Sequence, residues 1–172
     1  LKRLPYLAEK TLEHAESIRW FAESLRHKRS VFFIGRGLDY PVALEGSLKL
    51  KEISYIHSEA YAAGELKHGT LALIEPGTPV IALATQPELY DKTVSNIKEV
   101  KARGAHVMGI TCEGNVGLLN IVDEICFIPN TEGLFAPVLA VIPLQLLSYY
   151  TSLALGNDID KPRNLAKSVT VE

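Results

Sequence analysis

Short apolar runs alternate with longer segments of helical periodicity along this chain of 172 residues. A run that is apolar at successive positions is typical of a strand buried on both faces. Because such runs alternate with helices, the pattern predicts crossover connections and a parallel sheet of about five strands, covered by helices on both faces. The predicted strands are 31–34, 58–62, 80–84, 107–110 and 125–128, of which 58–62 is the weakest.

The segments between the runs carry the spacing of helices. Ile18, Phe21 and Leu25 recur at helical intervals and predict one leading helix over 7–28. The most apolar run, 134–150, is shorter than the roughly 20 residues of a membrane span, so we expect a buried helix there. The predicted helices are 7–28, 41–55, 87–103 and 135–155, with a helical turn at 64–68 and a stop signal at Gly156.

Composition and charge restrict the class of protein. Apolar residues make up 47% of the chain and charged residues 22%, which is ordinary for a globular domain with a full core. A net charge of −2 gives no basic surface for nucleic acid or an anionic membrane, so we expect neither as a partner. Cys112 and Cys126 are too few for a disulfide framework, and they fit a reducing cytoplasm.

The length predicts one domain with short appendages. We expect residues 1–30 to form a leading helix that packs on the domain, 31–156 to form the domain, and 157–172 to form an ordered carboxyl-terminal tail. The chain starts at Leu1 without a charged-then-apolar leader, which is typical of a cut in a longer protein.

Ligands bind beyond the carboxyl ends of the strands in parallel sheets of this kind. The loops after Ile34, Ala84 and Ile110 are therefore candidate site loops. A glycine turn at 35–37 follows the first strand, but Tyr40 stands where a dinucleotide fingerprint has its third glycine. The sequence thus gives only a weak signal for a nucleotide, and its scattered histidines predict no metal site.

Five polar residues are candidates for chemistry. Glu45, Lys49 and Glu52 share one helix face, although a solvated face with an ion pair has the same spacing. His68 lies in a glycine-flanked turn, where it is either a proton shuttle or an exposed side chain. Lys167 lies near the carboxyl terminus, and it is either a Schiff-base amine or a solvated lysine.

Three segments, 43–55, 59–69 and 160–172, resemble the second sugar isomerase (SIS) domain of the glucosamine-6-phosphate synthases, the glutamine:fructose-6-phosphate aminotransferases (isomerizing). The resemblance covers 31–172 and rests on motifs far longer than a short pattern. It implies a three-layer α/β/α SIS domain over 31–156, flavodoxin- or Rossmann-like, with a roughly five-stranded parallel sheet. It implies no cofactor.

The resemblance also assigns roles. Glu52 would be the base that moves a proton between C1 and C2 of the sugar, and Lys167 would form a Schiff base with the open-chain ketose. His68 would assist ring opening and reach into the neighbouring subunit's site, so a homodimer is expected. The substrates and products implied are fructose 6-phosphate and glucosamine 6-phosphate, and the residues implied to bind sugar are Glu45, Lys49 and Ala166.

Two parts of the resembling enzymes have no counterpart in this chain: the glutaminase domain and the first SIS domain, which holds the sugar phosphate. The loop at 35–40 has no hydroxyl cluster, and we expect Asp39 to repel a phosphate there. The chain alone is therefore expected not to make glucosamine 6-phosphate. The alternative to an isomerase domain is a non-catalytic SIS module for sugar-phosphate binding or dimerisation.

Overall fold

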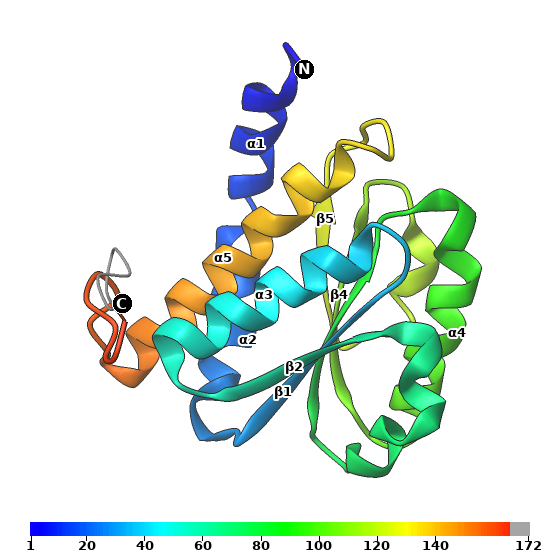
Figure 1. The fold of residues 1–172 in the computed structure, drawn as a ribbon. Helices are drawn as coiled ribbons and strands as arrows, with labels where there is room; N and C mark the ends of the chain where they lie inside the picture. The colour runs from blue at the N-terminus through cyan, green and yellow to red at the C-terminus, as the bar shows by residue number, and fades with distance from the viewer. Residues whose placement is uncertain (166–172) are drawn as a thin grey trace, which may run out of the picture.

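A parallel sheet forms the centre of the molecule (Figure 1). The computed structural model of the chain describes residues 1–165. The strand order is β2-β1-β3-β4-β5, and every adjacent pair is parallel. All five predicted strands are confirmed: β1 (Ser30–Gly35), β2 (His57–Ala62), β3 (Pro79–Ala84), β4 (His106–Cys112) and β5 (Glu124–Ile128). The connection from β1 leads to β2 on one side of it, and the next connection leads from β2 to β3 on its other side, so a switch point lies between β1 and β3.

Helices cover both faces of the sheet, as Figure 1 shows. Alternate residues of β1 enter different cores: Phe33 lies in the core beneath α3 and α5, and Phe32 lies in the core beneath α4. The predicted three-layer α/β/α arrangement is therefore confirmed. The helices are α1 (Leu4–Leu12), α2 (Ala15–Ser24), α3 (Asp39–Ser54), α4 (Tyr90–Lys101) and α5 (Ala136–Leu155).

The single leading helix predicted over 7–28 is wrong, because the segment forms two helices, α1 and α2, and a short 3₁₀ turn (Leu25–His27). At the break the backbone N–H groups of Glu13 and His14 donate to carbonyls three residues back, which tightens and ends α1. The buried residues Leu7, Thr11 and Ile18 still keep helical spacing across the break. Periodicity alone therefore cannot reveal it.

The apolar helix α5 is a core helix, as expected, although it is longer than the apolar run that predicted it. Its 20 residues and apolar composition would also suit a membrane span. In the fold, however, it packs against both α2 and α3, and Gly156 ends it with a φ of 75°. Its buried residues are Ala136, Leu139, Ala140, Pro143, Leu144, Leu147, Ser148, Thr151 and Ser152.

Candidate functional site

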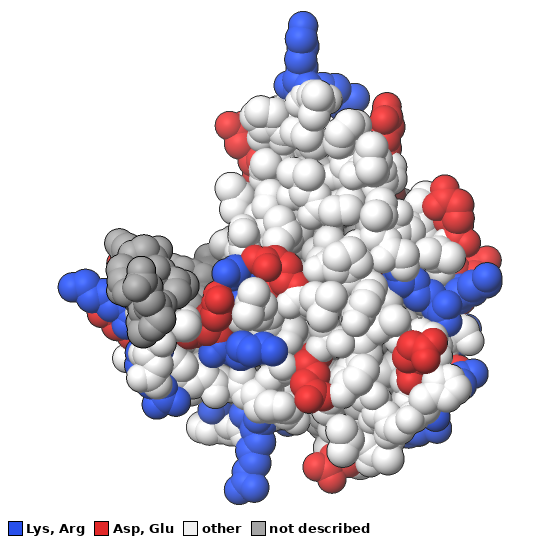
Figure 2. All heavy atoms as spheres, in the orientation of Figure 1, with Lys and Arg blue, Asp and Glu red and all other residues white. Residues whose placement is uncertain are grey.

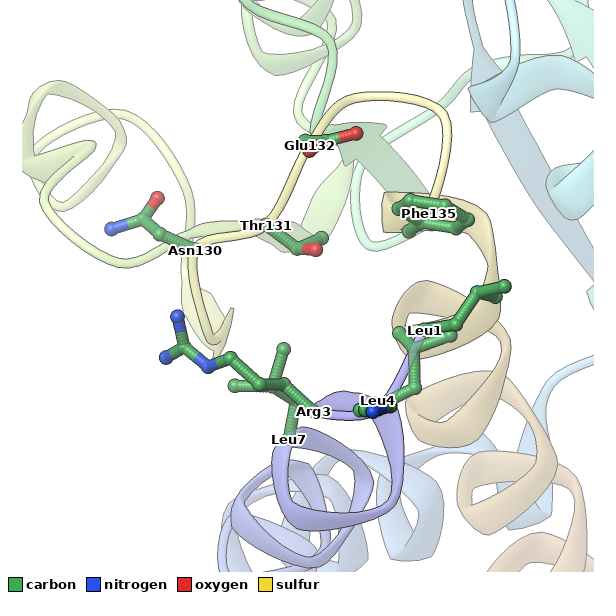
Figure 3. A pocket seen from close by; sticks show the side chains of 9 residues that line it. Leu1, Arg3, Leu4, Leu7, Asn130, Thr131, Glu132 and Phe135 are labelled. Atoms are coloured by element: carbon green, nitrogen blue, oxygen red, sulfur yellow. The ribbon is translucent and has the colours of Figure 1, made fainter.

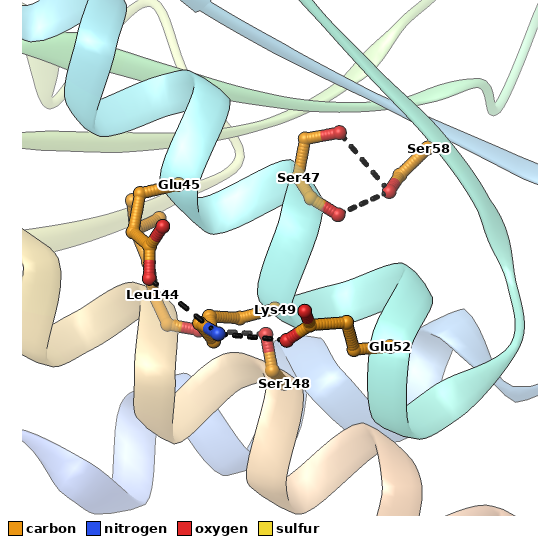
Figure 4. A network of polar contacts seen from close by, with 7 residues as sticks. All are labelled: Glu45, Ser47, Lys49, Glu52, Ser58, Leu144 and Ser148. Atoms are coloured by element: carbon orange, nitrogen blue, oxygen red, sulfur yellow. Dashed lines mark hydrogen bonds and ion pairs between the residues drawn. The ribbon is translucent and has the colours of Figure 1, made fainter. Parts of the chain in front are cut away.

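Helix α3 brings three of the predicted site residues together on one face (Figure 4). Lys49 Nζ lies 2.7 Å from Glu52 Oε2 and 3.7 Å from Glu45 Oε1. An adjacent side of the helix packs so closely on α5 at Gly46 that a Cβ there would meet Leu144 at 2.6 Å. Two serines, Ser47 and Ser58, also tie α3 to β2. The charged face is thus held by a rigid helix.

Glu52 is the least exposed of the three, with 28% of its side chain accessible against 37% for Lys49 and 41% for Glu45. The hydrogen bond to Glu52, together with the charges of Glu52 and Glu45, raises the pKa of Lys49 despite its partial burial. Lys49 therefore remains an ammonium at neutral pH. Such a group can balance a carboxylate or bind a sugar oxygen, but it is a poor nucleophile.

Asp39, the first residue of α3, joins the start of this helix to the end of β3, and it is only 1% exposed. Its carboxylate accepts hydrogen bonds from the backbone N–H of Thr85, at 2.8 Å, and from the Thr85 hydroxyl. Burial raises the pKa of Asp39, although these hydrogen bonds oppose the shift. The carboxylate thus faces the end of β3 rather than solvent, and its expected repulsion of a phosphate stays a prediction.

Arg36, in the loop between β1 and α3, is a group that the sequence analysis did not single out. Its Nε donates to Asn96 Oδ1 on α4 at 2.9 Å, and its guanidinium packs so closely on Gly64 that a Cβ there would lie 2.8 Å from it. The available signal was position alone, since Arg36 and Asp39 both follow the first strand at the ligand-binding edge of the sheet. Their partners are distant in sequence and could not be read from it.

His68 lies apart from the α3 residues within one chain. It ends a short 3₁₀ segment, Ala63–His68, that follows the carboxyl end of β2. Its side chain is 74% exposed, and its Nε2 lies 3.8 Å from Glu65. Glu52 lies 13 residues beyond the first residue of α3, or about 20 Å along the helix from that same edge of the sheet. The predicted helical turn at 64–68 is confirmed, but one chain does not bring His68 to Glu52.

Lys167 and Ala166 lie outside the described residues. The part of the tail that is described returns to the carboxyl end of α3. Asn157 Nδ2 donates to the carbonyl of Ile53 at 3.2 Å, and the hydroxyl of Ser152 donates to the same carbonyl at 2.8 Å. These bonds satisfy a carbonyl that the end of a helix leaves free.

A separate pocket of about 420 Å³ opens between α1 and the loop after β5 (Figure 3). Arg3 and Asn130 flank one side of the opening, and Leu1 and Phe135 flank the other. Glu45, Lys49, Glu52 and His68, the predicted site residues that the structure describes, do not line it. Within residues 1–165, no cluster of His, Cys, Asp and Glu is suited to hold a metal ion.

Comparisons with known proteins agree with the fold and the motifs. The glutamine–fructose-6-phosphate aminotransferase (isomerizing) of Clostridium tetani is 66% identical over 169 residues, which are 98% of this chain and 28% of that protein. Its counterpart in Caldanaerobacter subterraneus is 60% identical over 172 residues, which are 100% of this chain and 28% of that protein. The chain thus spans little more than a quarter of the length of these relatives.

A solved structure supports the same relationship. The C-terminal domain of glucosamine-fructose-6-phosphate aminotransferase from Francisella tularensis superposes with a TM-score of 0.88 and 42% identity, over 94% of this chain and 46% of that one. The family comparison matches residues 24–155, which include the whole sheet and the charged face of α3. The resemblance drawn from the motifs is therefore confirmed, and the chain belongs to the SIS domain family.

Proposed function

We propose that this chain is the isomerase domain of a glutamine–fructose-6-phosphate aminotransferase, an enzyme of amino sugar biosynthesis. The complete enzyme would convert fructose 6-phosphate and glutamine-derived ammonia to glucosamine 6-phosphate. Relatives of that name match at least 98% of the chain. The observation that carries the proposal is the Glu45–Lys49–Glu52 face, which holds a half-buried carboxylate beside a fixed ammonium.

Glu52 is the proposed base. Isomerisation of a ketose to an aldose moves a proton between adjacent carbons, C1 and C2, and a carboxylate placed over both can carry it. Lys49 donates its hydrogen bond to Oε2 of Glu52, so we assign the proton transfer to Oε1. The same ammonium holds the Glu52 carboxylate in position and can bind a sugar oxygen. Glu45 forms a second ion pair with Lys49 and helps to hold its ammonium in place.

Lys167 is the proposed Schiff-base residue, on the strength of the motif at 160–172. Its neutral Nζ adds to the C2 carbonyl of the open-chain ketose, water leaves, and the resulting iminium acidifies the protons on C1. Lys49 is a poor candidate for this step because its pKa is raised. Ala166, the neighbour of Lys167, would contact the sugar.

His68 is proposed to act on a second copy of the chain, because within one copy it lies away from Glu52. An exposed imidazole at a subunit boundary can shuttle the proton needed for ring opening near pH 7. A homodimer also suits the surface in Figure 2, where a broad uncharged area extends over the amino-terminal halves of α3 and α5. Exposed apolar residues on these helices include Leu44, Leu48, Val138 and Leu153.

Mixed dimers test the exchange of His68. Complete enzyme carrying Glu52→Gln is mixed with enzyme carrying His68→Asn, and the subunits are allowed to exchange. If His68 acts across the interface, each mixed dimer has one intact site, and random mixing restores about a quarter of wild-type activity. If both residues act within one chain, no intact site forms and activity stays at the level of the single variants.

Trapping tests the proposed function itself. The complete enzyme is incubated with fructose 6-phosphate and sodium borohydride, which delivers hydride to the iminium carbon and leaves a stable secondary amine. Peptide mapping is expected to find the label on Lys167, and Lys167→Arg is expected to abolish it, since a guanidinium stays charged. A label on Lys49 or Lys161 would refute the assignment.

The chain alone, without a glutaminase, is expected to yield no glucosamine 6-phosphate from glutamine.

A cytoplasmic location completes the proposal. Cys112 and Cys126 are both free and buried. Burial raises the pKa of both thiols, that of Cys126 to about 12. Protonated, buried thiols are unreactive and behave as small apolar side chains, which suits a reducing compartment.

A further inference from the structure

Two residues in unusual backbone conformations lie at one junction of the molecule. Among residues 1–165, Tyr55 and Asn164 are the non-glycine residues with a positive φ, at 64° and 61°. Tyr55 ends α3, and Asn164 directly follows Arg163 in the carboxyl-terminal segment. A left-handed helix end normally carries glycine, because a side chain there costs free energy. A tyrosine in that position calls for a reason that involves its side chain.

The side chain of Tyr55 holds Arg163 in two ways. The backbone N–H of Arg163 donates a hydrogen bond to the Tyr55 hydroxyl at 2.9 Å, across 108 residues of sequence. The Arg163 guanidinium lies 4.1 Å from the centre of the Tyr55 ring, within the range of a cation–π contact. One aromatic side chain thus binds both the backbone and the side chain of Arg163.

The contact between Tyr55 and Arg163, called the clamp below, joins two segments of the chain. One is next in sequence to Glu52 and the other is next in sequence to Lys167, the two residues that the proposed chemistry needs. Glu52 precedes Tyr55 by three residues, less than one turn of α3. Lys167 follows Arg163 by four residues, and four residues of any chain span at most about 14 Å. Fixing Arg163 on Tyr55 therefore limits how far the Lys167 amine can lie from the Glu52 end of α3.

We propose that Tyr55 and Arg163 are a positioning pair that holds the Lys167 amine within reach of the sugar carbon beside Glu52. The inference rests on the proposed function, in which Lys167 forms the Schiff base. Neither residue of the pair is proposed to touch the substrate. Each raises the effective concentration of the amine at the C2 carbonyl by restricting the segment that carries it.

Three variants of the complete enzyme separate the parts of the clamp. Tyr55→Gly removes the ring and hydroxyl and suits the left-handed backbone, so strain at the helix end does not unfold it. Tyr55→Phe keeps the ring and removes only the acceptor for Arg163. Arg163→Lys keeps the charge but loses the planar group that stacks on the ring. Tyr6→Leu is the matched control, because Tyr6 is an exposed tyrosine with a lysine 6.0 Å from its ring.

The measurement is the rate of borohydride-trapped label on Lys167 at several fructose 6-phosphate concentrations. We expect the saturating rate to fall about tenfold or more in Tyr55→Gly and a few-fold in Tyr55→Phe and Arg163→Lys. The half-saturating sugar concentration should change less than about twofold, because the phosphate and sugar contacts remain. Tyr6→Leu should label like wild type. A general loss of stability would not separate rate from half-saturation in this way.

Two failures are distinguishable. Label on Lys167 in wild type, at an equal rate in Tyr55→Gly and Arg163→Lys, would overturn the positioning pair and leave the proposed function intact. Absence of Lys167 label in wild type would overturn the proposed function and the positioning pair together. Loss of label in Tyr55→Gly with normal label in Tyr55→Phe would support the pair and assign its effect to the ring.

Discussion

The two ends of α3 carry carboxylates in opposite environments. Asp39, in the first turn, is 1% exposed and is hydrogen-bonded by Thr85. Glu52, near the last turn, keeps 28% of its side chain exposed and faces the Lys49 ammonium. One helix thus uses an acid at its start to join two loops and an acid near its end that remains accessible to a ligand.

Comparing the two acids shows how burial separates a structural role of a carboxylate from a reactive one. Burial raises the pKa of Asp39, because its carboxylate is stabilised by a backbone N–H and a hydroxyl and has no cation bonded to it within residues 1–165. Its oxygens are already engaged by Thr85. Glu52 is bonded to the Lys49 ammonium through one oxygen and stays partly exposed, as the proposed proton transfer to a substrate requires. Four predictions test this contrast.

Glu52→Gln should have the largest effect. The change preserves side-chain size but removes the base, so the isomerisation rate of the complete enzyme should fall by about 10²- to 10⁴-fold. Steady-state kinetics would measure it, and the affinity for fructose 6-phosphate should change little. Glu59→Gln on β2 is a control for a neighbouring carboxylate outside the triplet. Near-normal isomerisation in Glu52→Gln would place the proton transfer on another residue.

Asp39→Ala should instead affect stability. It leaves the N–H and hydroxyl of Thr85 buried without an acceptor, a change that costs about 1–3 kcal/mol. Urea unfolding of this chain would measure the loss. Glu52→Ala, at the other end of the helix, should cost less than about 1 kcal/mol because its ion pair is partly exposed. Equal losses at the two ends would contradict the contrast.

The pH dependence of stability should differ in sign between two acids. The pKa of Asp39 is raised, so the folded state binds the proton more tightly, and stability falls as pH rises from about 4 through the folded pKa. Burial would raise the pKa of Asp123 too, but bonds from Lys101 and Val107 outweigh it and lower that pKa. Asp123 therefore contributes stability that is lost as pH falls.

Variants separate these two contributions in urea titrations between pH 3 and pH 8. As pH rises above about 4, the free energy of unfolding should decline less in Asp39→Asn than in wild type. As pH falls toward 3, it should decline less in Asp123→Asn than in wild type. A steeper decline with rising pH in Asp39→Asn would show that the sign assigned to Asp39 is wrong.

Lys49→Met should have the smallest effect on stability. Exposed or half-exposed ion pairs contribute about 0.2–1 kcal/mol and are weakened by salt, so the free energy of unfolding should change by less than about 0.5 kcal/mol in 0.5 M NaCl. Unfolding in urea at low and high salt would measure the change. A loss as large as that in Asp39→Ala would mean that the charged face of α3 is a structural element rather than a reactive one.

Local patterns predicted the parts of the molecule that depend on local rules. The strands follow from apolar runs, because a parallel strand buries both faces. The shared face of Glu45, Lys49 and Glu52 follows from the pitch of a helix. The roles of these residues came from the family motif and, like those of His68 and Lys167, they remain predictions.

Long-range contacts explain what could not be predicted. Asp39 and Thr85 are 46 residues apart, and Tyr55 and Arg163 are 108 apart, so no spacing connects them. The break between α1 and α2 was missed for a different reason. The buried stripe from Leu7 through Ile18 keeps its period, and the break depends on how the two helices pack against α5.

The hydrogen bonds that close the carboxyl end of α3 have a consequence for synthesis. The carbonyl of Ile53 receives its side-chain donors from Ser152 and Asn157, 99 and 104 residues later in the chain. At typical ribosomal rates those donors are made about 5–20 s after Ile53. Until then water must satisfy this end of the helix, so the segment that carries Glu52 acquires these neighbours only after about a hundred further residues have been made.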